Sequence, residues 1–287
     1  MKKTLIAHSP DADDIFMYYA IKFGWVDMKN THFDNIAQDI QTLNEEALKG
    51  AYEIVAISFA LYPHIKEDYA PLRTAVSFGE GYGPKLIKKK GAKLKRNFKV
   101  ALSGKHTTNA MLFRMAYPDA RITYMNFLEI EQAVLDGKVD AGVLIHESIL
   151  TFDKELEVER EIWDIWQELA GDDLPLPLGG MAISRSIPLN KAIEYEATLT
   201  KAVRVARDHK DRLSKMLIER DLVRIDASTL DKYLELYAND ESITLSEIQY
   251  KAIDKLFELG YKHGFYDSLV KTKDYLIPTE YKELRNS

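Results

Sequence analysis

The sequence predicts an α/β protein of two lobes with a ligand cleft between them. Short apolar runs alternate with amphipathic segments in residues 4–57 and again in residues 99–145. This βαβαβ order is typical of parallel sheets with right-handed crossovers. Gly/Pro-rich stretches at 79–84 and 174–180 mark the points where the chain would cross between two such blocks. Chains built in this way commonly close on a small ligand by a hinge.

The first block has five predicted elements. Ser9 is a good N-cap for its first helix, and the acidic residues behind Ser9 favour the positive end of the helix dipole. Gly50 ends the second helix. The strands are expected at Thr4–Ala7, His32–Ile36 and Glu53–Ile57, and the helices at Asp13–Phe23 and Thr42–Lys49.

The second block repeats this order after an irregular stretch. Residues 72–78 look extended, and the Lys-rich residues 85–99 predict a solvated surface segment. A helical tail begins near residue 190, and its segment 243–260 is clearly amphipathic. The strands of the second block are expected at Lys99–Leu102, Arg121–Met125 and Asp140–Ile145, and its helices at Asn109–Tyr117 and Leu128–Asp136.

These elements divide the chain into two predicted lobes. Residues 1–90 and 184–287 form lobe I, which holds the first α/β block and the C-terminal helices. Residues 91–183 form lobe II, which is inserted into it. The length of 287 residues suits one large domain or two of ordinary size.

Composition narrows the class of protein. The net charge of −6 argues against a nucleic-acid partner, and the absence of cysteine excludes disulfides and thiolate chemistry. The apolar run Leu5–Ala7 is far shorter than the roughly 7–15 residues of a signal peptide. No apolar run approaches the ~18 residues that span a membrane. We therefore expect a cytoplasmic protein without membrane or nucleic-acid partners.

His146 is the leading catalytic candidate. The sequence Ile145-His146-Glu147-Ser148 follows the apolar run Ala141–Leu144, which has the composition of a buried parallel strand. Ligands of open α/β sheets bind at the carboxyl ends of such strands, and imidazole titrates near neutral pH. The alternative is a structural histidine at a strand end. Glu147 would point to the opposite face of a continuing strand, which makes it a poor partner for His146.

Hydroxyl groups provide a second candidate feature. The residues Ser103-Gly104-Lys105-His106-Thr107-Thr108 open a predicted helix, where free backbone N–H groups favour an anion. Ordinary capping by Thr107 is the alternative. Ser58 and Asn44 would face the same cleft from lobe I, although turn and capping roles also explain them. His8 is a further residue that would lie at this edge.

Several other chemistries lack their motifs. His146-Glu147 has no second histidine at the spacing of a zinc-protease helix, and the sequence has no GxSxG nucleophile elbow. The acidic run Asp11–Asp14 lacks the calcium-loop pattern and is better explained as a helix start. We expect no metal site.

Taken together, the motifs resemble a known family. Ser9-Pro10 with Asp14, Thr42-Leu43-Asn44, Gly104–Thr108, Ile145–Ser148 and Leu174–Gly179 occur in this order. In this the chain resembles the 1,4-dihydroxy-6-naphthoate synthases of the futalosine route to menaquinone. Where that family often has Ser-Pro-Cys-Pro-Asn-Asp, this chain has Ser9-Pro10-Asp11-Ala12-Asp13-Asp14, so the resemblance assigns no role to Asp11–Asp13.

The resemblance implies both a fold and a reaction. It implies a type II periplasmic-binding-protein-like fold and a lyase that converts cyclic dehypoxanthine futalosine to 1,4-dihydroxy-6-naphthoate with release of dihydroxyacetone. His146 would be the general base, and Asn44, Ser58, Thr107 and Thr108 would bind a small carboxylate substrate. No cofactor is implied, and a homodimer is compatible with the sequence.

Two other functions share this fold. One is a non-enzymatic binding protein for a small carboxylate, and the other is the sister enzyme, chorismate dehydratase. A titrating imidazole and the short apolar run at the N-terminus argue against the first. The Leu-Pro-Leu-Pro-Leu-Gly run and the His-Glu-Ser motif favour the naphthoate synthase over the second.

Overall fold

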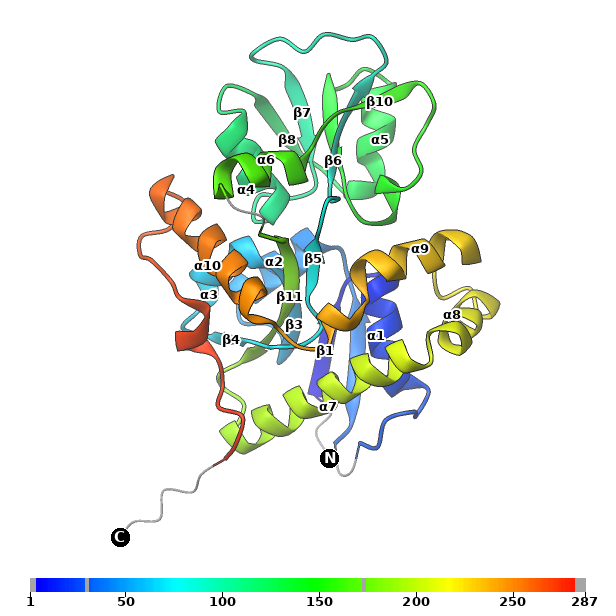
Figure 1. The fold of residues 1–287 in the computed structure, drawn as a ribbon, viewed down its shortest axis with the longest axis vertical. Coiled ribbons are helices and arrows are strands. Elements are labelled where there is room, and N and C mark those ends of the chain that lie inside the picture. The colour runs from blue at the N-terminus through cyan, green and yellow to red at the C-terminus, as the bar shows by residue number, and fades with distance from the viewer. Residues whose placement is uncertain (1–3, 29–30, 172–173, 282–287) are drawn as a thin grey trace.

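The computed structural model describes residues 4–28, 31–171 and 174–281, and its strands form two separate sheets (Figure 1). In the first sheet the order is β2-β1-β3-β11-β4, and β5 pairs with the other end of β11. The strands are β1 (Thr4–His8), β2 (Phe33–Ala37), β3 (Ile54–Ser58), β4 (Tyr69–Pro71), β5 (Ser77–Gly79) and β11 (Leu176–Ser184).

The second sheet has the order β10-β6-β9-β7-β8. The strands β7, β8 and β9 are mutually parallel, as the sequence predicts, whereas β6 runs antiparallel to both of its neighbours. The strands are β6 (Lys85–Lys89), β7 (Lys99–Leu102), β8 (Arg121–Tyr124), β9 (Ala141–Leu144) and β10 (Leu156–Glu161).

Helices cover both sheets and fill the C-terminal third of the chain. The helices α1, α7, α8 and α9 lie together on one side of the first sheet, and α4, α5 and α6 belong to the second (Figure 1). The α-helices are α1 (Ala12–Lys22), α2 (Ile40–Leu48), α3 (Tyr62–Ile65), α4 (Thr108–Ala116), α5 (Phe127–Leu135), α6 (Ile162–Ala170), α7 (Leu189–Asp208), α8 (Lys210–Glu219), α9 (Ala227–Tyr237) and α10 (Glu247–Lys262). The 3₁₀ helices are η1 (Phe59–Leu61), η2 (His146–Ile149), η3 (Asp240–Ser242) and η4 (Thr272–Tyr275).

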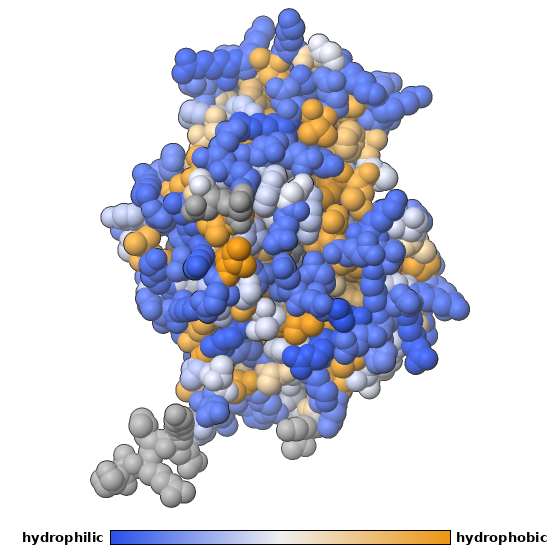
Figure 2. Space-filling model, viewed as in Figure 1, coloured by the Kyte–Doolittle hydropathy of each residue, from blue (hydrophilic) through white to orange (hydrophobic). Residues whose placement is uncertain are grey.

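The architecture is the predicted α/β fold of two lobes. The chain passes from the first sheet to the second between β5 and β6, and it returns to the first sheet between β10 and β11. The second lobe is therefore an insertion between two segments that belong to the same sheet. The boundaries 90/91 and 183/184 stay a prediction, and residues 1–3 and 282–287 of lobe I lie outside the described residues. Figure 2 shows apolar surface at the waist where the two lobes meet.

The Lys-rich segment differs from its prediction as a solvated surface segment. Its first residues form β6, in which Leu86 and Ile87 are fully buried between β9 and β10. Carboxylates of the neighbouring strand β10 neutralise the lysines, as in the ion pair of Lys88 with Glu159 at 2.5 Å. Burial of the two apolar side chains therefore outweighs the charge of their neighbours.

Two other local predictions also change. The N-cap of α1 is Asp11 and not Ser9, so the helix begins two residues later than a Ser9 cap would place it. The run 174–180, predicted as a chain crossing, does lie where the chain returns to the first sheet, but its residues from Leu176 on are already part of β11, which pairs with β5, β3 and β4 along its length. These shifts place the acidic start of α1 at the carboxyl end of β1, beside the site described next.

Candidate active site

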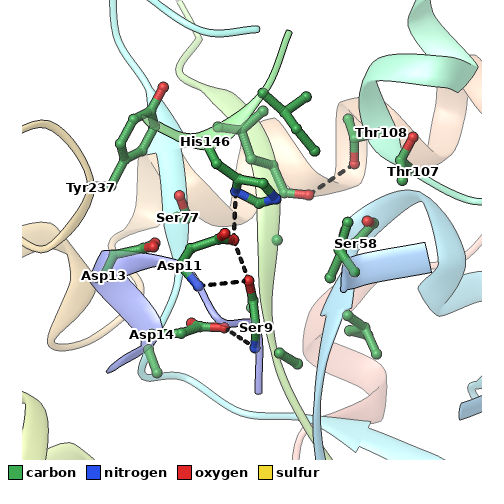
Figure 3. A pocket seen from close by; sticks show the side chains of 18 of the residues that line it. Ser9, Asp11, Asp13, Asp14, Ser58, Ser77, Thr107, Thr108, His146 and Tyr237 are labelled. Carbon is green, nitrogen blue, oxygen red and sulfur yellow. Dashed lines mark hydrogen bonds and ion pairs between the residues drawn. The ribbon is translucent and has the colours of Figure 1, made fainter. Parts of the chain in front are cut away.

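A cavity of about 110 Å³ lies where the two lobes meet. Its walls differ in chemistry, as Figure 3 shows: the carboxylates and His146 lie on one side, and the hydroxyl groups of Ser58, Thr107 and Thr108 lie on the other. The polar lining includes Ser9, Asp11, Asp13, Asp14, Ser58, Ser77, Thr107, Thr108, Asn109, His146, Tyr233 and Tyr237. Such a cavity has room for several waters or part of a small ligand.

The chain turns sharply at His146. The strand β9 ends at Leu144, and His146 opens η2 with a φ of 56°, in the left-handed region that non-glycine residues rarely adopt. A conformation of this kind costs about 1–3 kcal/mol and is concentrated at functional sites. The turn directs the imidazole into the cavity. The ring of Phe127 packs against the imidazole in an edge-to-face pair, with ring centroids 4.9 Å apart.

Asp11 holds the imidazole of His146. The Nδ1 atom of His146 lies 2.6 Å from Oδ2 of Asp11, whose side chain is only 2% exposed (Figure 3). A carboxylate at this distance accepts the Nδ1 proton and leaves the lone pair of a neutral imidazole on Nε2. The pair therefore has the geometry of an oriented general base.

The Nε2 atom of His146 is free for a ligand. It is buried and has no hydrogen-bond partner within the part of the chain that the structure describes. Buried polar atoms are rarely left without a partner, and exceptions call for an explanation. Because His146 lines the cavity, a bound ligand is the natural partner for this atom.

Charged neighbours set the protonation of His146. Burial acts to lower its pKa, but the charge and hydrogen bond of Asp11, with help from Glu147 and Asp13, raise the pKa above its ordinary value of 6.5. Opposite charges at short range favour the protonated form. The surroundings of His146 therefore favour its protonated form more than water does.

The neighbouring carboxylates hold their protons unusually tightly. Burial, together with the charge of Asp11, raises the pKa of Asp14 to about 7. Burial and the charges of Asp14 and Asp11 also raise the pKa of Asp13 well above 3.8, and burial raises that of Glu147. This wall of the cavity is consequently less negative than its sequence suggests.

These raised pKa values predict how stability depends on pH. A group whose pKa is higher in the folded state stabilises the protein below its unfolded pKa and loses that contribution as pH rises through the folded value. For Asp14 the window runs from 3.8 to about 7. We expect the free energy of unfolding, measured by urea titration, to fall as pH rises across this window. The decline should be smaller in Asp14→Asn, and an equal decline in both proteins would contradict this assignment.

The opposite wall uses its hydroxyl groups partly for structure. Ser58 and Asn44 bond each other twice: Ser58 N donates to Asn44 Oδ1 at 3.0 Å, and Asn44 Nδ2 donates to Ser58 Oγ at 3.1 Å. Asn44 is fully buried behind Ser58, and Ser58 lines the cavity. Asn44 thus orients Ser58, and direct binding of substrate by either residue stays a prediction.

Thr107 and Thr108 open α4 at the cavity. Thr107 caps the helix by accepting from Ala110 N at 3.3 Å, and binding of an anion at this helix start stays a prediction. Thr108 donates to the carbonyl of Leu178 and accepts from Ala60 N, and it therefore ties α4 to the other lobe. Both hydroxyl protons are used within the protein, so an anion here would bind mainly to N–H groups of the first helical turn.

His8 has a structural role. Its Nδ1 bonds the carbonyl of Ser9 at 2.7 Å, and its Nε2 accepts from Asn35 Nδ2 at 3.1 Å. Burial lowers its pKa, which favours the neutral form. The imidazole lies outside the main cavity and beside a smaller one.

Comparison with known proteins identifies the family of this chain. A family model described as "Menaquinone biosynthesis" matches residues 4–262. The chain belongs to this family. The sequence motifs resemble the 1,4-dihydroxy-6-naphthoate synthases of menaquinone biosynthesis, and the family match, together with the two relatives described next, confirms this resemblance. A role in menaquinone biosynthesis follows.

Two curated relatives carry the same enzyme name. The chain is 29% identical to a 1,4-dihydroxy-6-naphthoate synthase of Streptomyces coelicolor, over 92% of this chain and 95% of the relative. It is 26% identical to one of Thermus thermophilus, over 90% and 93%. The chain thus matches both of these relatives along nearly their whole length.

Solved structures support the fold. A protein from Archaeoglobus fulgidus superimposes with a TM-score of 0.84 at 32% identity, over 92% of this chain and 98% of that one. A Candida albicans protein described as having the generic periplasmic binding protein fold gives a TM-score of 0.70 at 10% identity, over 99% and 98%. The chain therefore has the predicted periplasmic-binding-protein-like fold.

No helix in the described part of this family member is long and apolar enough to cross a membrane. Residues 4–28, 31–171 and 174–281 also contain no group of three or more His, Cys, Asp or Glu side chains arranged to hold a metal ion.

Sequence reasoning missed part of the site. Asp11, which the family resemblance left without a role, is the partner of His146, and Glu147 is not. The position of Asp11 just beyond β1 was a usable signal, because both residues follow strands whose carboxyl ends point to the cavity. Tyr233, Tyr237 and Arg224 come from the helical tail, where no motif marks them.

Proposed function

We propose that this protein is a carbon–carbon lyase that converts cyclic dehypoxanthine futalosine to 1,4-dihydroxy-6-naphthoate and dihydroxyacetone. The observation that carries the proposal is the buried Nε2 atom of His146, which faces the cavity without a partner while Nδ1 is bound to Asp11. The names of the two curated relatives support the choice of reaction. We propose that the reaction takes place in the cytoplasm.

His146 would act as the general base. Breaking a C–C bond beside an oxygenated carbon requires that a proton is removed and that the developing negative charge is stabilised. A neutral imidazole within hydrogen-bond reach removes the proton, and proton transfer of this kind contributes about 10²–10⁴-fold in rate. Asp11 then stabilises the imidazolium that forms, since it accepts the Nδ1 proton throughout.

The side of the cavity that carries Ser58, Thr107 and Thr108, the hydroxyl wall, would bind the substrate carboxylate. Thr107 and Thr108 at the start of α4, and Ser58, lie across the cavity from His146 (Figure 3). A helix N-terminus favours negative charge, and preorganised donors also stabilise charge that develops during a reaction. Because lining residues come from both lobes, lobe closure around the substrate would exclude water from the intermediate.

The test is a product assay with two substrates. Purified protein is incubated separately with cyclic dehypoxanthine futalosine and with chorismate, and products are identified by mass spectrometry. We expect naphthoate and dihydroxyacetone in equal amounts from the first substrate and no reaction with the second. Turnover of chorismate alone would identify the sister dehydratase, and binding without turnover of either substrate would identify a receptor.

A further inference from the structure

Arg224 contacts the catalytic pair from the helical tail. It lies in the bend between α8 and α9, and the same Nη2 atom is 3.1 Å from Asp11 Oδ1 and 3.1 Å from Glu147 Oε2. The guanidinium also packs over the ring of Phe127, with Cζ 5.2 Å from the ring centroid. Phe127 in turn packs against His146. Arg224 therefore touches three of the groups that surround the proposed base and not the base itself.

Glu147 belongs to the second lobe and contacts two residues of the first lobe, Ala12 and Arg224. It follows β9 of the second sheet, whereas its Oε1 accepts from the backbone N–H of Ala12 at the start of α1, at 3.0 Å. α1 packs on α7, α8 and α9 and belongs with the first sheet. Opening of the lobes would separate Glu147 from both Ala12 and Arg224. The side chain of Glu147 is only 8% exposed, so its carboxylate is largely shielded from solvent.

We propose that Arg224 is a positioning residue that acts through Asp11 and Glu147, joins the lobes in the closed form and keeps His146 available as a base. The expected effect of Arg224 on kcat/KM rests on the proposed function. The expected effect of Arg224 on the pKa of His146 rests on the geometry alone, and it can be measured without substrate.

The surrounding charges show why a cation is needed here. The groups that face His146 from the neighbouring elements are Asp11, Asp13 and Asp14 at the start of α1, Glu147 on η2, and Tyr233 on α9, whose hydroxyl bonds Asp13. Arg224 is the cation bound to two of these carboxylates. Without it, their negative charge would favour a protonated His146, which cannot accept a proton.

The inference predicts opposite shifts from two substitutions. Arg224→Met removes a positive charge near the pair, so we expect the pKa of His146 to rise. Glu147→Gln removes a negative charge that raises this pKa, so we expect it to fall. The two changes break the same ion pair, and a purely structural role would give shifts of the same sign or none.

NMR titration of the His146 ring in the free protein measures these shifts directly. The matched control is Arg207→Met, which removes an arginine of similar exposure that pairs with Asp240; neither residue lines the cavity. An unchanged His146 pKa in Arg224→Met, or equal shifts in that variant and the control, would overturn the proposal. Arg224→Lys keeps the charge and should give a smaller shift, which provides a second reading if the Met variant folds poorly.

Kinetics provide the second readout. We expect Arg224→Met to lower kcat/KM by about 10²-fold, the scale of a modest misplacement of a catalytic group. Arg224 is 38% exposed, so guanidinium at non-denaturing concentrations should reach the vacated position of an Arg224→Ala variant and restore part of the activity. Absence of rescue together with an unchanged pH profile would contradict the positioning role. Absence of turnover by the wild type would contradict the proposed function only, because the titration would still test Arg224.

Discussion

Replacement of His146 by glutamine is expected to reduce kcat by about 10²–10⁴-fold, the usual contribution of a general base. Glutamine is polar and close to histidine in size, but its amide cannot take up a proton near neutral pH. The loss should appear mainly in kcat, because the hydroxyl wall that would hold the substrate carboxylate is untouched. Steady-state formation of the naphthoate measures the effect.

The control for this variant is His263→Gln. His263 is an exposed histidine at the C-terminal end of α10, outside the cavity. We expect wild-type rates from it and an unchanged far-UV circular dichroism spectrum from both variants. A kcat for His146→Gln within a few-fold of the wild type would remove His146 as the base while leaving the family assignment intact.

Asp11→Asn is expected to reduce kcat by a comparable factor, about 10²–10⁴-fold, through the tautomer of His146. In the wild type, Oδ1 of Asp11 meets Arg224, and Oδ2 meets both His146 Nδ1 and the hydroxyl of Ser9. The side-chain amide of the asparagine has only one acceptor oxygen, and this oxygen would keep the hydrogen bond from Arg224. The amide NH₂ would then face Nδ1 and stabilise the tautomer with its proton on Nε2, where a base needs a lone pair.

The pH profile separates this explanation from simple misfolding. Removal of the Asp11 charge takes away the main influence that raises the pKa of His146, so the pKa should fall. The rising limb of kcat/KM should therefore move to lower pH while the plateau drops. Asp39→Asn, which changes a carboxylate that caps α2 and does not itself line the cavity, is the matched control and should change neither. A full plateau rate in Asp11→Asn would contradict the tautomer argument.

The sequence predicts the parallel parts of the fold well. Hydrophobic runs such as Ala141–Leu144 and the capped helices between them locate β1, β3, β7, β9 and their crossovers to within a few residues. Local pattern fails where partners come from distant segments. The strand β6 looked like a solvated lysine segment because the carboxylates of β10 that neutralise it lie about 70 residues further along the chain.

The site divides in the same way. His146, Ser58 and Thr108 are found at the cavity because each follows a strand or opens a helix at a sheet edge. The pairing of His146 with Asp11 was missed because the expected strand continued through His146. The left-handed turn at His146 instead changes the direction of the chain, and the imidazole meets Asp11 beyond the end of β1. Arg224 lies 213 residues from Asp11 and meets it only through the tertiary fold.

The most direct test of the central claim compares two pKa values. The pH dependence of kcat/KM reports the essential base of the free enzyme, and NMR titration reports His146 in the same free enzyme. We predict that kcat/KM for cyclic dehypoxanthine futalosine rises with pH through a pKa above 6.5, and that this value coincides with the titration of His146. A rising limb that differs clearly from the His146 titration, or a rate independent of pH across it, would contradict the account.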